Sequence, residues 1–152
     1  MEHKPLAELQ TIADVKIAEP TAPMSREQRL QRWIEVLEAN GNRKLRSLYQ
    51  IEYLSAQERR EYCSNSSPLV VAYEDSVLRA EGLKSDRVGD CLAFFQITER
   101  QVHHAFCSCH VGSTFSAKDA AARLRHLLPP QNQFRHLGAS ILQGVRNLFV
   151  VR

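Results

Sequence analysis

The stretch of residues 25–41, SREQRLQRWIEVLEANG, carries a full set of signals for one amphipathic helix. Ser25 and Gln28 have the spacing of a capping box, in which each side chain accepts a hydrogen bond from a backbone amide left unpaired at a helix start. The Asn-Gly pair at 40–41 is a typical left-handed stop. Between these signals, large apolar side chains recur at three- and four-residue spacing on one face: Leu30, Trp33, Ile34 and Leu37. The stretch predicts a helix that buries this face, with Trp33 as a core anchor.

Similar start signals recur along the chain. Ser55, Thr98 and Ser116 each precede an acidic or amide side chain by three residues. Ser67 precedes Pro68, which suits a first helical position because proline has no amide hydrogen to leave unpaired. Apolar spacing then predicts helices along the stripe at 45–51, after Ser55, at 68–82 (or a strand at 69–73), from Ser85 to 95, from Thr98 through His110, and at 116–128.

The fold class that follows is all-α, a compact bundle of about six or seven short helices with a loose N-terminal tail. A chain of 152 residues suits one core. Prolines interrupt residues 1–24, which are therefore predicted to be a flexible tail. Residues 25–130 form the predicted helical domain, and residues 131–152 form a basic amphipathic C-terminal arm.

The apolar runs are too short for a membrane span, which needs roughly 20 residues. The first residues also lack the basic start and apolar block of a secretory signal. We therefore expect a cytoplasmic protein with no membrane contact. In that compartment the four cysteines would remain thiols or bind metal rather than form disulfides.

The C-terminal arm combines positive charge with an apolar stripe. Asp119 is the last acidic side chain, and five arginines follow it, three of them in the arm. Apolar residues recur at helical spacing in the arm and include Phe134, Ile141 and Leu148. We expect these three residues to bind a protein partner or a second copy of the chain, with nucleic acid as a weaker alternative partner.

Residues 103–110, HHAFCSCH, hold three of the six histidines and two of the four cysteines. On a helix of 3.6 residues per turn, His103, Cys107 and His110 share one arc, whereas Cys109 falls on the apolar arc. A thiolate and two imidazoles suit zinc, or less specifically another transition metal. His103, Cys107 and His110 are therefore the candidate metal ligands, and Cys109 is expected in the core. The fourth ligand would come from Cys91, His104, another element or water.

Two other interpretations of this cluster stay open. A neighbouring imidazolium would lower the pKa of Cys107 and make it a reactive or redox-sensing thiol. Alternatively, the histidines are polar residues on the exposed face of an amphipathic helix. Neither an orienting acid nor an oxyanion motif accompanies Cys107, and phosphate-loop and nucleophile-elbow motifs are absent, so we do not expect an enzyme.

The helices predicted on either side of residues 96–98 also suggest a helix-turn-helix, in which Arg100, Gln101, His103 and His104 would face DNA. Taken together, the patterns favour a small cytoplasmic helical interaction or regulatory module that binds a protein partner and needs no cofactor. The alternative is a metal-binding, zinc-dependent or thiol-based sensor built on the His/Cys cluster. The second alternative is a nucleic-acid-binding helix-turn-helix regulator.

Overall fold

The structure is a computed structural model that describes residues 22–130. Most of its secondary structure is helical. The helices are α2 (Arg26–Ala39), the short 3-10 helix η1 (Ile51–Tyr53), α3 (Ala56–Glu61), α4 (Pro68–Glu74), α5 (Ser76–Ala80), α6 (Val88–Phe95), α7 (Glu99–Phe106), α8 (Ser108–Val111) and α9 (Ala117–Arg125). Two three-residue strands, β1 (Lys44–Arg46) and β2 (Thr114–Ser116), complete the described elements. The predicted all-α class is confirmed. Residues 1–21 of the predicted tail and the whole predicted arm, 131–152, lie outside the described residues.

Polar caps begin several helices at the predicted positions. Four residues form a capping box with both reciprocal hydrogen bonds in place: Ser25, Ser55, Thr98 and Ser116. Ser67 caps α4, its hydroxyl accepting a hydrogen bond from the Val70 amide at 3.4 Å, and Pro68 occupies the first turn. These bonds satisfy amides that have no partner inside the helix, and so they fix where each helix begins.

Two predicted helices have different bounds in the structure. The helix expected over 68–82 is broken at Asp75, which ends α4 and caps α5. The Asp75 carboxylate accepts a hydrogen bond from the Leu78 amide at 2.9 Å, and this local bond replaces the continuous helical ladder. The helix expected from Ser85 begins at Val88, and Ser85 lies in the preceding loop.

The helix predicted along 45–51 is wrong. Asn40 ends α2 with a φ of −132°, so its stop is not left-handed, and the chain then enters β1, which pairs antiparallel with β2. Leu45 is buried between two exposed neighbours, the alternation of a strand. Leu48 then forms a separate, parallel bridge with Cys107, in which its amide donates to the Phe106 carbonyl at 2.9 Å. Within this part of the described chain, helical geometry returns only at η1.

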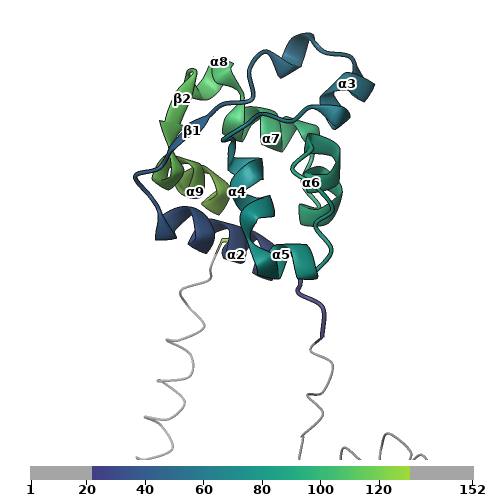
Figure 1. Cartoon of the computed structure of the whole chain (residues 1–152), viewed down its shortest axis with the longest axis vertical. Coiled ribbons are helices and arrows are strands. Elements are labelled where there is room, and N and C mark those ends of the chain that lie inside the picture. Colours follow the sequence, from purple (N-terminus) through teal and green to yellow (C-terminus); the bar gives the residue numbers. More distant parts are fainter. Residues whose placement is uncertain (1–21, 131–152) are drawn as a thin grey trace, which may run out of the picture.

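Trp33 of α2 lies at the centre of the core and is fully buried, as predicted. Its ring stacks on Phe95 with 4.4 Å between centroids and packs against Phe106 at 5.6 Å. The indole N–H donates to the Pro68 carbonyl at 3.0 Å, so one side chain joins α2 to α4, α6 and α7. In Figure 1, α2 and α5 lie at one end of the molecule and α7 and α8 toward the other, which places the His/Cys cluster away from the α2 end.

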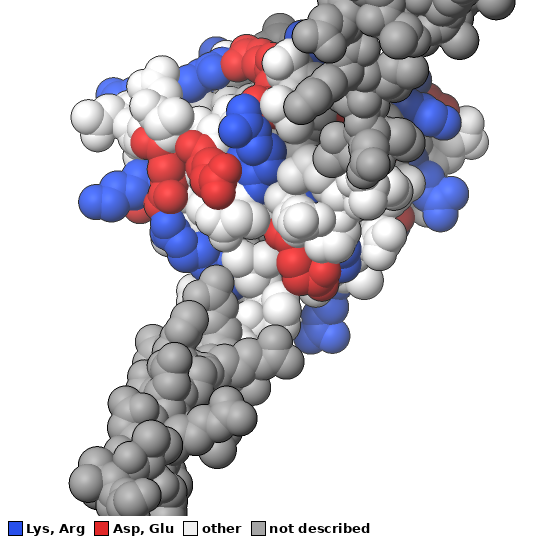
Figure 2. Space-filling model, turned by 90° about the horizontal axis from the view of Figure 1, so that it is seen from below, with Lys and Arg blue, Asp and Glu red and all other residues white. Residues whose placement is uncertain are grey.

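The face around α2 and α5 carries charges of both signs. Figure 2 shows Lys and Arg interspersed with Asp and Glu on the visible part of this face. Such mixing is typical of a solvated surface rather than of an electrostatic docking site. Among the helices that the structure describes, none has the length and apolar character needed to cross a membrane.

Candidate metal centre

The helix that carries the histidines ends earlier than the sequence predicts. α7 stops at Phe106, and Cys107 has an extended backbone with φ −68° and ψ 142°. Leu48 accounts for this break, because its amide donates to the Phe106 carbonyl at 2.9 Å and its carbonyl accepts from the Ser108 amide at 3.2 Å. These hydrogen bonds between two distant segments use backbone groups that a continuous helix would have paired internally. The single helix expected from Thr98 through His110 is therefore wrong, and α8 is a separate short helix.

The break exchanges the environments predicted for the two cysteines. Cys107 is fully buried, whereas Cys109 is exposed. The expectation that Cys109 faces the core is wrong, because the helical projection assumed one straight helix. The Cys109 thiol donates to the Cys107 Sγ at 3.1 Å, so the two sulfur atoms are in contact across the start of α8.

Two of the three predicted ligands lie together, and Cys109 stands with them. Ligand atoms of His103, Cys109 and His110 all lie within 4.8 Å of one another, and His103 Nε2 is 3.6 Å from Cys109 Sγ. Cys107 belongs to a second group of three, with Cys109 and Glu52, within the same limit. Cys109 is thus shared by two candidate ligand sets that meet at the junction of α7 and α8.

Burial raises the pKa of the Cys107 thiol to about 12, and hydrogen bonding with Cys109 and the carboxylate of Glu52 contributes to the net rise. Cys107 therefore remains a neutral thiol at physiological pH, and it donates its hydrogen to Glu52 Oε2 at 3.1 Å. The same hydrogen bond is the main cause that lowers the pKa of Glu52. The interpretation of Cys107 as a thiol with a lowered pKa is therefore wrong, because burial and the Glu52 carboxylate raise this pKa.

Glu52 is the site residue that sequence reasoning missed. It lies in η1, 55 positions before Cys107, and the packing of η1 against the α7–α8 junction brings the two side chains together. No local spacing could have indicated this contact. Cys91, considered as a fourth ligand, is instead buried in α6, where its thiol donates to the Ser85 carbonyl at 3.7 Å.

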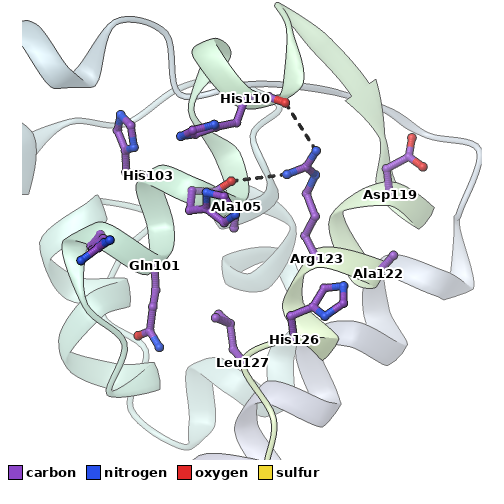
Figure 3. Close-up of a pocket in the computed structure, with 11 residues that line it drawn as sticks. Gln101, His103, Ala105, His110, Asp119, Ala122, Arg123, His126 and Leu127 are labelled. Atoms are coloured by element: carbon purple, nitrogen blue, oxygen red, sulfur yellow. Dashed lines mark hydrogen bonds between the residues drawn. The ribbon is translucent and has the colours of Figure 1, made fainter.

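A cleft with a volume of about 900 Å³ adjoins the cluster and lies between α7 and α9. His103 and His110 line its upper edge (Figure 3). His104 packs against His110 with 4.8 Å between ring centroids. Arg123 of α9 reaches across and donates to the carbonyls of His104 and His110, each at 3.4 Å. We refer to this space as the α7–α9 cleft.

Fold and site together define a small, mostly helical protein with a candidate transition-metal centre at a helix junction. The chain matches no protein-family model, and no curated protein or solved structure shows significant similarity to it. The arguments about function therefore rest on the residues of the chain itself.

Proposed function

We propose that the protein is a metal-binding regulatory module that holds a zinc ion at the junction of α7 and α8. The observation that carries the proposal is the convergence of His103, Cys109 and His110, whose ligand atoms lie within 4.8 Å of one another. One thiolate and two imidazoles form a typical donor set for zinc. Modest side-chain rotations would bring these atoms to the separations of roughly 3.3–3.8 Å that a tetrahedral zinc site requires.

Cys107 is a candidate fourth ligand through its contact with Cys109, and it would have to leave Glu52 and approach the two histidines, with which it shares no ligand group. Its Sγ lies 3.1 Å from the Cys109 Sγ, so a metal bound by Cys109 would be within reach of both sulfur atoms. Zinc would first have to displace the Cys107 proton, because thiols bind this metal as thiolates. Four protein ligands would make a closed structural centre, whereas water in the fourth position would leave the site open to exchange.

The regulatory part of the proposal follows from the position of the site. Zinc would join the end of α7 to α8 across the backbone break at Cys107. α8 has four residues and none of them is buried, so its own packing contributes little to holding it in place. Metal occupancy would then determine how firmly the surface of α8 is presented to a protein partner. The residues predicted to bind such a partner, Phe134, Ile141 and Leu148, lie outside the described residues.

Elemental analysis of the full chain, purified without an affinity tag, tests the proposal. We expect about one zinc per chain, and we expect Cys109→Ser to lose it because the shared thiolate is removed. Cys63→Ser is the matched control, since Cys63 is an exposed cysteine outside both ligand sets. Failure of the wild-type chain to retain zinc after loading, or equal retention by Cys109→Ser, would refute a site built on Cys109.

A DNA-binding helix-turn-helix is a second candidate function, favoured by the conformation of Gln96. This residue ends α6 in the left-handed region, with φ 51° and ψ 49°, and only three residues separate α6 from α7. Short turns of this kind join the two helices of the DNA-binding motif. The apolar residues of this unit that face the core are buried: Cys91, Phe95, Ile97, Val102 and Ala105. Arg100 and His104 remain exposed on α7.

Titration of random duplex DNA into the full chain across a salt series tests this second function. If α7 approaches DNA, Arg100→Gln should remove one phosphate contact. The slope of the logarithm of the binding constant against the logarithm of the salt concentration should then fall in magnitude by about one. Arg79→Gln is the control, because Arg79 is exposed on α5 at the other end of the molecule. The absence of salt-dependent binding, or an equal effect of Arg79→Gln, would exclude α7 as a DNA-reading helix.

A further inference from the structure

The α7–α9 cleft has the size of a small-molecule site. Its volume of about 900 Å³ is near the upper end of the usual range for ligand pockets, roughly 300–1,000 Å³. Side chains of α7, α8 and α9 surround it on three sides (Figure 3). A ligand there would contact the candidate metal ligands His103 and His110 at the edge of the cleft. It would also contact side chains of α7 and α9 that the metal centre does not use, so the cleft needs its own explanation.

Basic groups dominate the polar lining of the cleft. Besides the candidate metal ligands His103 and His110, two come from α7 and two from α9 or its C-terminal end: Arg100, His104, Arg123 and His126. In the described part of the chain, neither Arg100 nor Arg123 forms a salt bridge with a carboxylate. Arg123 instead uses two of its N–H groups on backbone carbonyls, which fixes its guanidinium toward the cleft. Asp119 is the one acidic side chain among the lining residues, and its carboxylate interacts electrostatically with Arg123, so the arginines and histidines leave the lining with an excess of basic groups.

The one carboxylate in the lining is committed elsewhere. Asp119 accepts hydrogen bonds from the Ser116 hydroxyl at 2.6 Å and from the Ser116 amide at 3.3 Å, as the reciprocal part of the cap of α9. These two bonds are the main causes that hold the pKa of Asp119 below its ordinary value. Asp119 thus serves the start of α9, the helix that also carries Arg123, whereas Arg100 and His104 line the cleft from α7.

Apolar side chains form the remainder of the lining. Ala105 is buried at the base, and Ala122 and Leu127 of the α9 segment complete this surface. Pockets that bind small organic molecules typically combine such apolar surface with a few polar groups that orient the ligand. The combination fits a ligand with an anionic head and a compact apolar body.

We infer that the α7–α9 cleft binds a small organic molecule that carries a phosphate group. Arginine and histidine N–H groups from two helices would donate to the phosphate oxygens. Several donors that converge from two sides suit a phosphate better than a carboxylate, because a phosphate has more acceptor oxygens and more negative charge. The apolar body of the ligand would pack on Ala105, Ala122 and Leu127. This inference goes beyond the proposed metal site, because the arginine and histidine donors that it uses lie outside both candidate ligand sets.

Calorimetric titration of the full chain tests the inference with two probes, phenyl phosphate and inorganic phosphate. Both titrations are run with a chelator present, so that bound zinc cannot contribute to the binding of either phosphate. We expect saturable binding of phenyl phosphate and weaker binding of inorganic phosphate, which lacks the apolar body. Arg100→Gln and His126→Ala should each weaken phenyl phosphate binding by roughly tenfold, the usual loss for one hydrogen bond to a charged group.

Lys118→Gln is the matched control, because Lys118 is an exposed cation of α9 that does not line the cleft. It should leave binding unchanged. Arg100 and His126 are exposed, and neither side chain makes a hydrogen bond in the described structure, so their variants should fold. The inference is overturned by no saturable binding up to about 10 mM phenyl phosphate. An equal loss in Lys118→Gln would also overturn it, because nonspecific charge would then explain the binding.

Discussion

Cys107 and Cys109 touch each other through their sulfur atoms but differ in what surrounds them. Cys107 is fully buried and Cys109 is exposed. Replacing Cys107 should therefore lower the stability of the metal-free protein, whereas replacing Cys109 should affect metal binding but not that stability. In metal-free protein, Cys107→Ala should lower the free energy of unfolding by about 1–2 kcal/mol, because a buried side chain and its hydrogen bond with Glu52 are lost.

Cys109→Ala should change the stability of the metal-free protein by less than about 0.5 kcal/mol, as is usual for an exposed position. Urea denaturation of both variants in the presence of a chelator measures the difference. Similar losses in the two variants would contradict the assignment of Cys107 to the core and Cys109 to the surface.

Gln96 is a second residue whose conformation has a measurable consequence. A side chain with a Cβ atom pays a conformational penalty at φ 51°, which glycine avoids. Gln96→Gly should therefore raise the free energy of unfolding, by up to about 1 kcal/mol. Gln96→Ala is the control, because alanine retains the Cβ atom and should gain little. Urea denaturation compares the two variants, and a gain in Gln96→Ala equal to that in Gln96→Gly would contradict the backbone explanation.

At the level of single elements, Asp75 holds three helices together. It ends α4, caps α5 through the Leu78 amide, and accepts a hydrogen bond from Arg32 of α2 at 2.7 Å. Burial by itself would raise the pKa of Asp75, but the hydrogen bonds from Arg32 and Leu78 lower it below its ordinary value of 3.8. The ionised carboxylate is therefore the form that stabilises the fold.

Asp75→Asn should lower the free energy of unfolding at pH 7 by about 1–2 kcal/mol, a range that allows for solvent around the partly exposed Arg32. The contribution of a carboxyl group with a lowered folded-state pKa is complete above its unfolded pKa and is lost as the pH falls through the folded value. The stability difference between wild type and Asp75→Asn should therefore shrink below about pH 4. Denaturation curves at pH 7 and in the acid range provide the measurement, and a constant difference would contradict the role of the charge.

Helix starts could be predicted from the sequence because the bonds that define them are local. The capping boxes at Ser25, Ser55, Thr98 and Ser116 each involve residues three positions apart. The two strands could not be predicted in this way, because each has three residues and exists only through pairing with a segment some 70 positions away. The break at Cys107 has the same origin, since it depends on backbone bonds with Leu48.

At the scale of the whole molecule, the candidate site is the product of long-range packing. The sequence indicated His103 and His110 because they lie in one dense cluster, and the structure keeps them together with Cys109. It could not indicate Glu52, whose approach depends on how η1 packs, nor the α7–α9 cleft, whose sides come from helices separated by β2. Composition and spacing thus located the cluster, whereas its ligand set depends on the folded backbone.

Zinc binding at a helix junction should also stabilise the molecule as a whole. A ligand that binds only the folded state adds about 2.7 kcal/mol at a hundredfold excess over its dissociation constant. For a domain of this size, that stabilisation should raise Tm by roughly 5 °C or more. Trp33, the single tryptophan, lies in the core and reports global unfolding through its fluorescence, while circular dichroism reports the helices.

Both signals should shift together when zinc is added to the metal-free chain, because the core around Trp33 joins α2, α4, α6 and α7 into one cooperative unit. Cys109→Ser should lose the shift, and Cys63→Ser should retain it. A zinc-dependent shift that persists in Cys109→Ser would locate the metal elsewhere on the chain. A shift in circular dichroism alone would mean that zinc orders a local segment without stabilising the core.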